Sequence, residues 1–235
     1  MSLVHVVCLK WGNKYGPEYV NRLYAAIKRN TTVKFRFYCL TDDRTGINHD
    51  IQIVPLNYAN QLDSWWNKIS LFSADLPIPI AQKIFYIDLD TLIVGNIDDL
   101  ISHQETDIVV LKDFYHGIAQ SAGTVASGLM SWNHRQYKHV WSEFIKNPKA
   151  AMKQAHPHGD QWWVEKNIAR HRFWQDLYPG QVVSFKMHCR TGLPPGARIV
   201  CYHGRPSIPE SATQHTKDWK FKMGPQPWVL DHWKD

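Results

Sequence analysis

Long hydrophobic runs are missing from this chain of 235 residues. No apolar segment approaches the roughly 20 residues that a membrane-spanning helix requires, and Met1 to His5 lack the charged start and cleavage site of a signal peptide. We therefore expect a cytoplasmic protein without a transmembrane segment. The aromatic and basic tail at 219–233 leaves peripheral membrane contact open, although packing on the domain is the favoured interpretation.

Cysteine is scarce, and no block of basic residues occurs. The four cysteines, Cys8, Cys39, Cys189 and Cys201, have no Cys-x-x-Cys spacing and lie largely in strand-like runs, which predicts reduced core thiols. Lys and Arg are dispersed in spite of a formal net charge of +6, so no nucleic acid partner is expected. The Gly-x-Gly-x-x-Gly fingerprint of dinucleotide binding is also absent.

Short apolar runs alternate with segments of helical periodicity along most of the chain. Strands are predicted at 3–9, 34–40, 51–54, 83–87, 107–111, 126–132, 181–185 and 198–202, and helices at 17–28, 64–73, 135–145 and 161–168. This alternation predicts an α/β fold with a mostly parallel central sheet flanked by helices. We expect one domain over 1–209 and an irregular tail, packed on it, over 210–235.

Two carboxylates follow the predicted strand at 83–87. Asp88 and Asp90 stand two residues apart, and Thr91 opens another apolar run. Ligands of open α/β sheets bind beyond the carboxyl ends of the strands, and burying an unpaired carboxylate is costly. The pair therefore predicts a cation, and oxygen ligands with room for water favour Mg²⁺ or Mn²⁺. The alternative is that both side chains only cap a turn.

His203 follows the predicted strand at 198–202. Its imidazole could complete the coordination of a metal, Gly204 permits close backbone approach, and Arg205 could bind phosphate. Because the chain has thirteen histidines, an ordinary core or surface histidine is the alternative.

Three further segments offer groups that a metal-diphosphate site needs. Lys68 could reach a phosphate or a sugar, or be a solvated helix lysine. Asp160 and Gln161 could bind hydroxyl groups, while Asp160 could equally be a plain N-cap. The loop at 9–15 follows the first strand, as a nucleotide-binding loop does.

The order of these segments resembles that of a known family. The motifs are Trp66-Asn67-Lys68, Tyr86-Ile87-Asp88-Leu89-Asp90, Ser127-Gly128-Leu129-Met130, His158-Gly159-Asp160-Gln161 and Tyr202-His203-Gly204-Arg205-Pro206. Over about residues 3–209 the chain resembles the GT-A glycosyltransferases similar to family 8, which include glycogenin and the bacterial lipopolysaccharide galactosyltransferases. The resemblance implies a GT-A (Rossmann-like) nucleotide-diphospho-sugar transferase. It would be a retaining hexosyltransferase that uses Mn²⁺, or Mg²⁺, a UDP-sugar donor and a carbohydrate or other hydroxyl-bearing acceptor.

The resemblance also implies a role for individual residues. The metal ligands would be Asp88, Asp90 and His203. The donor would contact Leu9, Lys10, Trp11, Tyr15, Lys68, Asp88, Leu89, Ser127 and Arg205. The catalytic residues would be Gln161, beneath the anomeric carbon, and Asp160, a ligand of the donor hydroxyls.

Two positions depart from the family pattern. Ser127 stands where relatives often have Asn, and Ser207-Ile208-Pro209 replaces a Lys-Pro pair, so that Arg205 is expected to supply the positive charge. No Asp or Glu is evidently placed as a covalent nucleophile. We therefore expect same-face attack by the acceptor, with Gln161 and Asp160 stabilising the sugar cation.

Two other functions are compatible with parts of the sequence. The run Asp88-Leu89-Asp90-Thr91-Leu92 also resembles the Asp-x-Asp-x-Thr motif of haloacid-dehalogenase phosphatases, with Thr91 one position early, although several strand and helix units precede it here. A noncatalytic module that binds a sugar or nucleotide is the other alternative, because function does not follow from fold.

Overall fold

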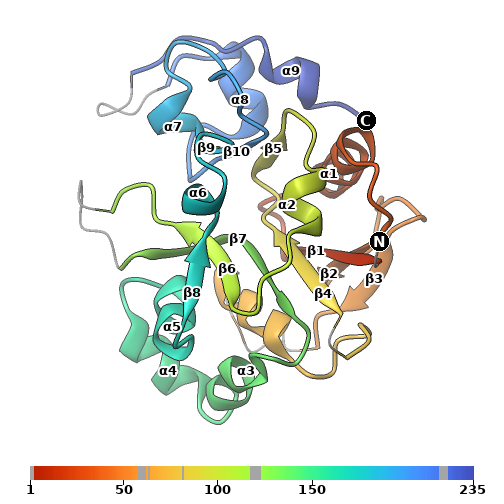
Figure 1. The fold of residues 1–235 in the computed structure, drawn as a ribbon, viewed down its shortest axis with the longest axis vertical. Helices are drawn as coiled ribbons and strands as arrows, with labels where there is room; N and C mark the ends of the chain where they lie inside the picture. The colour runs from red at the N-terminus through yellow and green to blue at the C-terminus, as the bar shows by residue number, and fades with distance from the viewer. Residues whose placement is uncertain (1–2, 58–61, 63, 81, 117–122, 217–221) are drawn as a thin grey trace.

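The main sheet is mixed and mostly parallel. The computed structural model describes residues 3–57, 62, 64–80, 82–116, 123–216 and 222–235. Within them, the main sheet has the strand order β3-β2-β1-β4-β7-β6-β8 (Figure 1). The strands are β1 Val4–Lys10, β2 Phe35–Thr41, β3 Gln52–Pro55, β4 Lys83–Ile87, β6 Ile108–Lys112, β7 Val125–Asn133 and β8 His171–Phe173. Only β7 is antiparallel to its neighbours in this described part, so the predicted parallel architecture is confirmed.

Alternate residues of the central strands pack into two separate cores. In β4, Phe85 and Ile87 join one hydrophobic cluster, whereas Ile84 and Tyr86 join the other. The period of two follows from strand geometry, in which successive side chains point to opposite faces. The sheet is therefore buried on both sides, as a doubly wound sheet requires.

Helices cover both faces of the sheet. The helices are α1 Pro17–Asn30, η1 Ser64–Phe72, α2 Asp98–Ser102, α3 Lys138–Phe144, α4 Pro148–Ala155, α5 Asp160–Asn167, α6 Trp174–Leu177, α7 Phe185–His188, α8 Ile208–Thr213 and α9 Val229–His232. Helix α1 begins at Pro17, which is pre-organised for a first helical position, and ends with Lys28 and Arg29 at the negative end of its dipole. Helices α3, α4 and α5 lie together below β8 in Figure 1.

A second, smaller sheet lies above the first in Figure 1. It consists of β5 Thr91–Ile93, β10 Ile199–Cys201 and β9 Val182–Ser184, with β10 in the middle. β10 is antiparallel to β5 and parallel to β9. Because β5 starts one residue after Asp90, the two predicted carboxylates lie in the link between the sheets.

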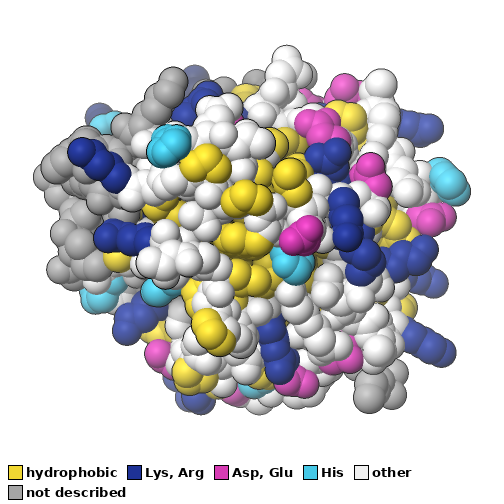
Figure 2. All heavy atoms as spheres, turned by 90° about the horizontal axis from the view of Figure 1, so that it is seen from above, with side chains coloured by type: hydrophobic (Ala, Val, Ile, Leu, Met, Phe, Trp, Pro, Cys, Tyr) yellow, Lys and Arg dark blue, Asp and Glu magenta, His cyan; other side chains and the backbone are white. Residues whose placement is uncertain are grey.

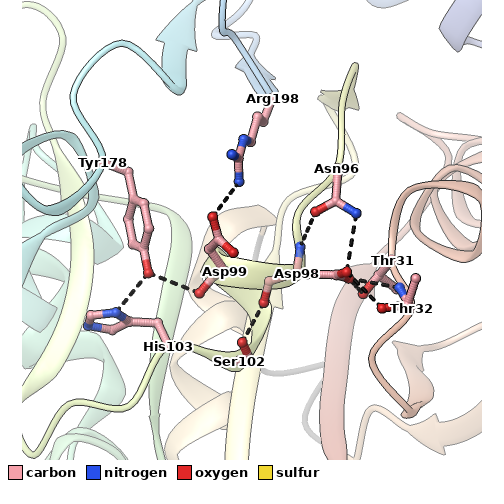
Figure 3. A network of polar contacts seen from close by, with 9 residues as sticks. All are labelled: Thr31, Thr32, Asn96, Asp98, Asp99, Ser102, His103, Tyr178 and Arg198. Carbon is pink, nitrogen blue, oxygen red and sulfur yellow. Dashed lines mark hydrogen bonds and ion pairs between the residues drawn. The ribbon is translucent and has the colours of Figure 1, made fainter.

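A polar junction connects α2 to its surroundings (Figure 3). Asp98 accepts hydrogen bonds from the Thr31 hydroxyl at 2.6 Å and from the Thr32 amide and hydroxyl, each at 2.7 Å. The neighbouring Asp99 forms an ion pair with Arg198 at 2.9 Å. We call this group the Asp98 junction. It connects the short helix α2 to the end of α1 and to Arg198, the residue before β10.

The predicted irregular tail contains two short helices, α8 and α9. Ser207 is the N-cap of α8, and its side chain and that of Glu210 form a capping box. The chain end contacts α1, where the rings of Tyr19 and Trp233 meet edge to face at 4.8 Å. The sequence shows no helical periodicity for α8 and α9, because helices this short depend on caps and contacts more than on a repeating apolar face. Trp219, with which the proposed membrane-contact segment begins, lies outside the described residues.

Other predicted elements are found at nearly the expected positions, with three differences. The predicted helix at 64–73 is a 3₁₀ helix, and the predicted strand at 181–185 ends at Ser184 because Phe185 starts α7. Helices α4 and α6 and strands β5 and β8 were not predicted, since each is too short for a clear period.

Two surface features bear on membrane contact. None of the helices in the described ranges combines the length and apolarity needed to span a membrane. Seen from above, hydrophobic side chains gather near the middle of the face shown in Figure 2, with charged side chains around them. Leu230 of α9, at the top of Figure 1, is 50% exposed.

Candidate active site

Seven of the predicted site residues line a cleft of about 550 Å³, here called the main cleft. It is lined by Trp65, Lys68, Asp88, Asp90, Thr91, Leu111, Asp113, Phe114, Tyr115, Ala126, Ser127, Gly128, Pro157, His158, Gly159, Asp160, Gln161, Cys201, Tyr202 and His203. The cleft therefore brings together residues from both sheets, from η1 and from α5. It lies where β4 ends, as expected for an α/β sheet.

Asp88 is held by contacts on both carboxylate oxygens. Oδ2 accepts a hydrogen bond from Lys68 at 3.0 Å, and Oδ1 accepts a short one from the Tyr86 hydroxyl. The backbone amide of Asp88 donates to the Gly128 carbonyl at 2.9 Å. A Cβ atom at Gly128 would lie only 3.2 Å from Oδ2, so the glycine lets β7 approach the carboxylate closely.

Lys68 is buried at the centre of the polar contacts. Its ammonium lies 3.0 Å from Asp88, 3.7 Å from Asp160 and 3.2 Å from the Ser127 hydroxyl, which in turn donates to Asp160 at 2.6 Å. Burial opposes the positive charge, but the carboxylates of Asp88 and Asp160 outweigh it and hold the pKa of Lys68 above its ordinary value. The solvated-lysine alternative is therefore wrong.

Asp160 is the first residue of α5 and is itself buried. No side-chain capping hydrogen bond is formed at this helix start, where Gly159 holds the N-cap position with φ +75°. The Asp160 carboxylate instead faces Ser127 and Lys68. This geometry disfavours the plain N-cap alternative and gives Ser127 a contact within the cleft.

Asp90 is buried beside the charge of Asp88 and has few hydrogen-bond donors. It accepts one hydrogen bond from the Tyr15 hydroxyl at 2.9 Å, and its carbonyl accepts from the Tyr202 amide at 2.9 Å. Burial and the nearby charge of Asp88 raise the pKa of Asp90 to about 6. A carboxylate in this state would be stabilised by an added cation.

His203 lines the main cleft but is turned toward the second sheet. Its Nε2 atom lies 2.8 Å from the Ser184 hydroxyl, and its ring lies 5.4 Å from that of Phe114. Burial and the charge of Lys186 lower the pKa of His203 to about 4, so the imidazole is neutral at physiological pH. Neutral imidazole is the form that binds a metal.

The three predicted metal ligands suit Mn²⁺ or Mg²⁺ by chemistry: two carboxylates with surplus negative charge, and a neutral imidazole. The three side chains lie too far apart to hold an ion without moving. Among the described residues, no three His, Cys, Asp or Glu side chains already stand close enough to hold an ion. Metal binding therefore stays a prediction.

A second cleft of about 150 Å³ adjoins the first, and we call it the loop cleft. It is lined by Leu9, Trp11, Lys14, Tyr15, Ser64, Trp65, Lys68, Tyr86, Asp88, Leu89 and Asp90. Trp65, Lys68 and both carboxylates line the two clefts. An elongated ligand could thus extend from the aromatic loop after β1, past the carboxylates, to α5.

Two predicted donor contacts line neither cleft. Arg205 is exposed and ion-paired with Glu210. Lys10 is buried, and its ammonium lies 3.4 Å from the Gly12 carbonyl. Gln161, by contrast, lines the main cleft as expected.

Sequence reasoning missed four side chains that shape the site. Tyr86 binds Asp88, Ser184 binds His203, and Trp65 and Asp113 line the main cleft. Only Tyr86 had a usable signal, because it lies two residues before Asp88 and so on the same side of the strand. Ser184 is distant in the sequence, and nothing local marks it.

The structure is similar to those of solved glycosyltransferases. The galactosyltransferase LgtC in complex with donor and acceptor sugar analogs aligns over 92% of this chain and 91% of its own, with 12% identity and a TM-score of 0.61. An active-site mutant of LgtC aligns over 97% and 94%, with 11% identity and a TM-score of 0.64. This chain has the GT-A fold.

The chain also aligns with the glycosyltransferase GlyE of Streptococcus pneumoniae TIGR4. The match covers 87% of this chain but only 55% of GlyE, with 13% identity and a TM-score of 0.61. No family model and no curated protein matches the sequence. Identities this low establish the fold, and the chemistry has to be argued from the site.

Proposed function

We propose that this protein is a metal-dependent glycosyltransferase. It moves a hexose from a UDP-sugar to an acceptor hydroxyl with retention of configuration. The observation that carries the proposal is the joining of the two clefts at Lys68, Asp88 and Asp90. One cleft offers aromatic side chains for a base, the other offers polar groups for a sugar, and the charged residues lie between them, where a diphosphate would lie.

The bound metal would be Mn²⁺, with Mg²⁺ as a substitute, held by Asp88, Asp90 and His203. It would supply Lewis-acid stabilisation of the leaving diphosphate. Lys68 adds a permanent positive charge nearby, because Asp88 and Asp160 hold its pKa above the ordinary value. The chain's own contribution is a fixed positive charge at the point where negative charge grows as the sugar–phosphate bond breaks.

Asp160 and Gln161 would act on the sugar itself. Both line the main cleft, and the Asp160 carboxylate is oriented by Ser127 and Lys68. A carboxylate and an amide oxygen in these positions can stabilise positive charge on the sugar ring while the acceptor attacks from the same face. The solved structures support the sugar ligands, since LgtC was crystallised with donor and acceptor sugar analogs.

The test is release of UDP from a panel of UDP-sugars with Mn²⁺, with and without a chelator. Asp160→Ala and Gln161→Ala should each lower turnover at least about 100-fold, whereas Gln104→Ala, an exposed glutamine outside both clefts, should not. Near-normal turnover of both cleft variants would contradict the catalytic assignment. Metal-dependent release of phosphate from simple phosphomonoesters would favour the phosphatase, and tight binding without turnover the noncatalytic module.

A further inference from the structure

Trp65 is a large apolar side chain placed in the wall of a polar site. It is 53% exposed and lines both the main cleft and the loop cleft. Most large aromatic side chains described here are buried in the two cores. An open indole face at the junction of two clefts is a surface for a ligand.

Two left-handed backbone positions hold this indole in place. Ser64, directly before it, has φ +52°, and Gly159, against which it packs, has φ +75°. A Cβ atom at Gly159 would lie 2.7 Å from the indole Nε1 atom. A left-handed serine is a strained position, and a glycine is required for both the φ angle and the space. The indole is thereby fixed beside Asp160.

The cleft that Trp65 borders is rich in carboxylates. Asp88, Asp90, Asp113 and Asp160 line it, and Lys68 is the one Lys or Arg among its described lining residues. The charge of a divalent metal would be balanced by the diphosphate of the donor. With Asp88 and Asp90 beside the metal and Asp160 paired with Lys68, Asp113 keeps the wall that the sugar meets negative, and like charges repel strongly where water is partly excluded.

We propose that the donor sugar is an uncharged hexose and that Trp65 selects it through its indole face. This proposal rests on the proposed function and names the substrate class of the same site. The C–H face of a neutral sugar ring packs favourably on the electron-rich indole. The carboxylate of a uronic acid would meet both that negative face and the acidic wall, so UDP-uronates are rejected.

The first experiment compares UDP-glucose and UDP-galactose with UDP-glucuronate and UDP-galacturonate, all in the presence of Mn²⁺. At least one neutral donor should exceed both uronates in kcat/KM by at least about tenfold, and bind more tightly. A uronate that is bound and turned over as well as the best neutral donor overturns the proposal.

The second experiment separates the sugar contact from the nucleotide contact. Trp65→Ala should weaken binding of the preferred UDP-hexose about tenfold but change the affinity for UDP alone by less than about threefold. Trp65→Phe should keep most of the affinity. An equal loss for UDP and UDP-hexose would place Trp65 on the nucleotide and overturn its role in selection.

The third experiment tests the charge of the wall at Asp113, to which the proposed mechanism gives no catalytic role. Asp113→Asn should strengthen binding of a UDP-uronate several-fold more than it changes binding of a UDP-hexose. The matched control is Asp231→Asn, an exposed aspartate of α9 outside both clefts. Equal uronate affinity in Asp113→Asn and the control overturns the electrostatic part.

The outcomes also separate the two proposals. If no UDP-sugar binds, the proposed function fails and takes this inference with it. If a UDP-hexose is turned over but the uronates are too, the proposed function stands and the selectivity is wrong. If hexoses bind selectively without transfer, the selectivity is supported and the catalysis is not.

Discussion

Two groups of carboxylates in this molecule have opposite surroundings. Asp98, in the polar junction of Figure 3, accepts hydrogen bonds on both oxygens from Thr31, Thr32 and Asn96. Burial opposes its charge, but these bonds outweigh that effect and hold its pKa well below the ordinary value. Asp90, in the cleft, has one donor and a like-charged neighbour, and its pKa is raised to about 6.

The difference distinguishes a structural carboxylate from a candidate ligand-binding one. A carboxylate whose oxygens are all paired holds chain segments together and adds to stability. One that is enclosed, short of donors and next to another acid is costly to the folded state, and such groups concentrate where a ligand supplies the missing charge. Both groups follow a short apolar strand, Asp88 and Asp90 after β4 and Asp98 after β5, so sequence position alone does not distinguish them.

The largest expected effect is on activity, from replacing the acid that Lys68 binds. Asp88→Asn should lower kcat/KM at least about 100-fold, because Lys68 and the proposed metal would lose a charged partner while the shape is kept. UDP release measures it, and Asp98→Asn serves as the control with nearly unchanged turnover. A similar loss of turnover in Asp88→Asn and Asp98→Asn would contradict the proposed difference between the two carboxylates.

The next effect is on stability, from removing the structural acid. Asp98→Ala should lower the free energy of unfolding by about 1–2 kcal/mol at neutral pH, because four donors lose their acceptor. The pKa of Asp98 is lowered in the fold, so its contribution is present above the unfolded value and is lost as pH falls through the folded one. Denaturant unfolding at several pH values is the measurement. A loss that persists unchanged in strong acid would contradict this origin.

The smallest effect has the opposite sign. Asp90→Asn in metal-free protein should raise the free energy of unfolding at pH 7 by about 1 kcal/mol, since the raised pKa of Asp90 means that the folded state disfavours its charged form. The folded pKa of about 6 lies above the ordinary value of about 3.9, so this cost should appear as pH rises through that window. Added Mn²⁺ should reverse the order of the two proteins. If the difference in the free energy of unfolding between the two proteins does not depend on pH, the charge of Asp90 does not destabilise the fold.

Much of this fold could be predicted from periodicity. The strand before Asp88 and the helix after Pro17 are found where the pattern placed them, because each is set by local propensity and a repeating apolar face. The antiparallel β7 and the second sheet are products of long-range pairing, and no local pattern distinguishes Val125–Asn133 from a parallel strand.

The candidate site was predictable only in part. Asp88, Asp160 and Lys68 do converge, as the order of their motifs indicated. The displacement of Arg205 onto Glu210 was not foreseen, because it depends on the start of α8, which places Glu210 three residues after its N-cap. Trp65 escaped notice since a tryptophan in a helical run normally packs inward, and its exposure depends on Gly159, almost a hundred residues away.

The segment from Asp88 to Asp90 is fastened at each end to a different sheet. The Asp88 amide bonds to Gly128 of the main sheet, and the Asp90 carbonyl accepts from Tyr202, which follows the central strand of the small one. The three residues thus connect the two sheets, so any shift of one sheet relative to the other changes the distance between the two acids. A ligand that bridges both acids would lock the two halves of the molecule together. Binding of such a ligand should therefore raise the free energy of unfolding of the whole chain.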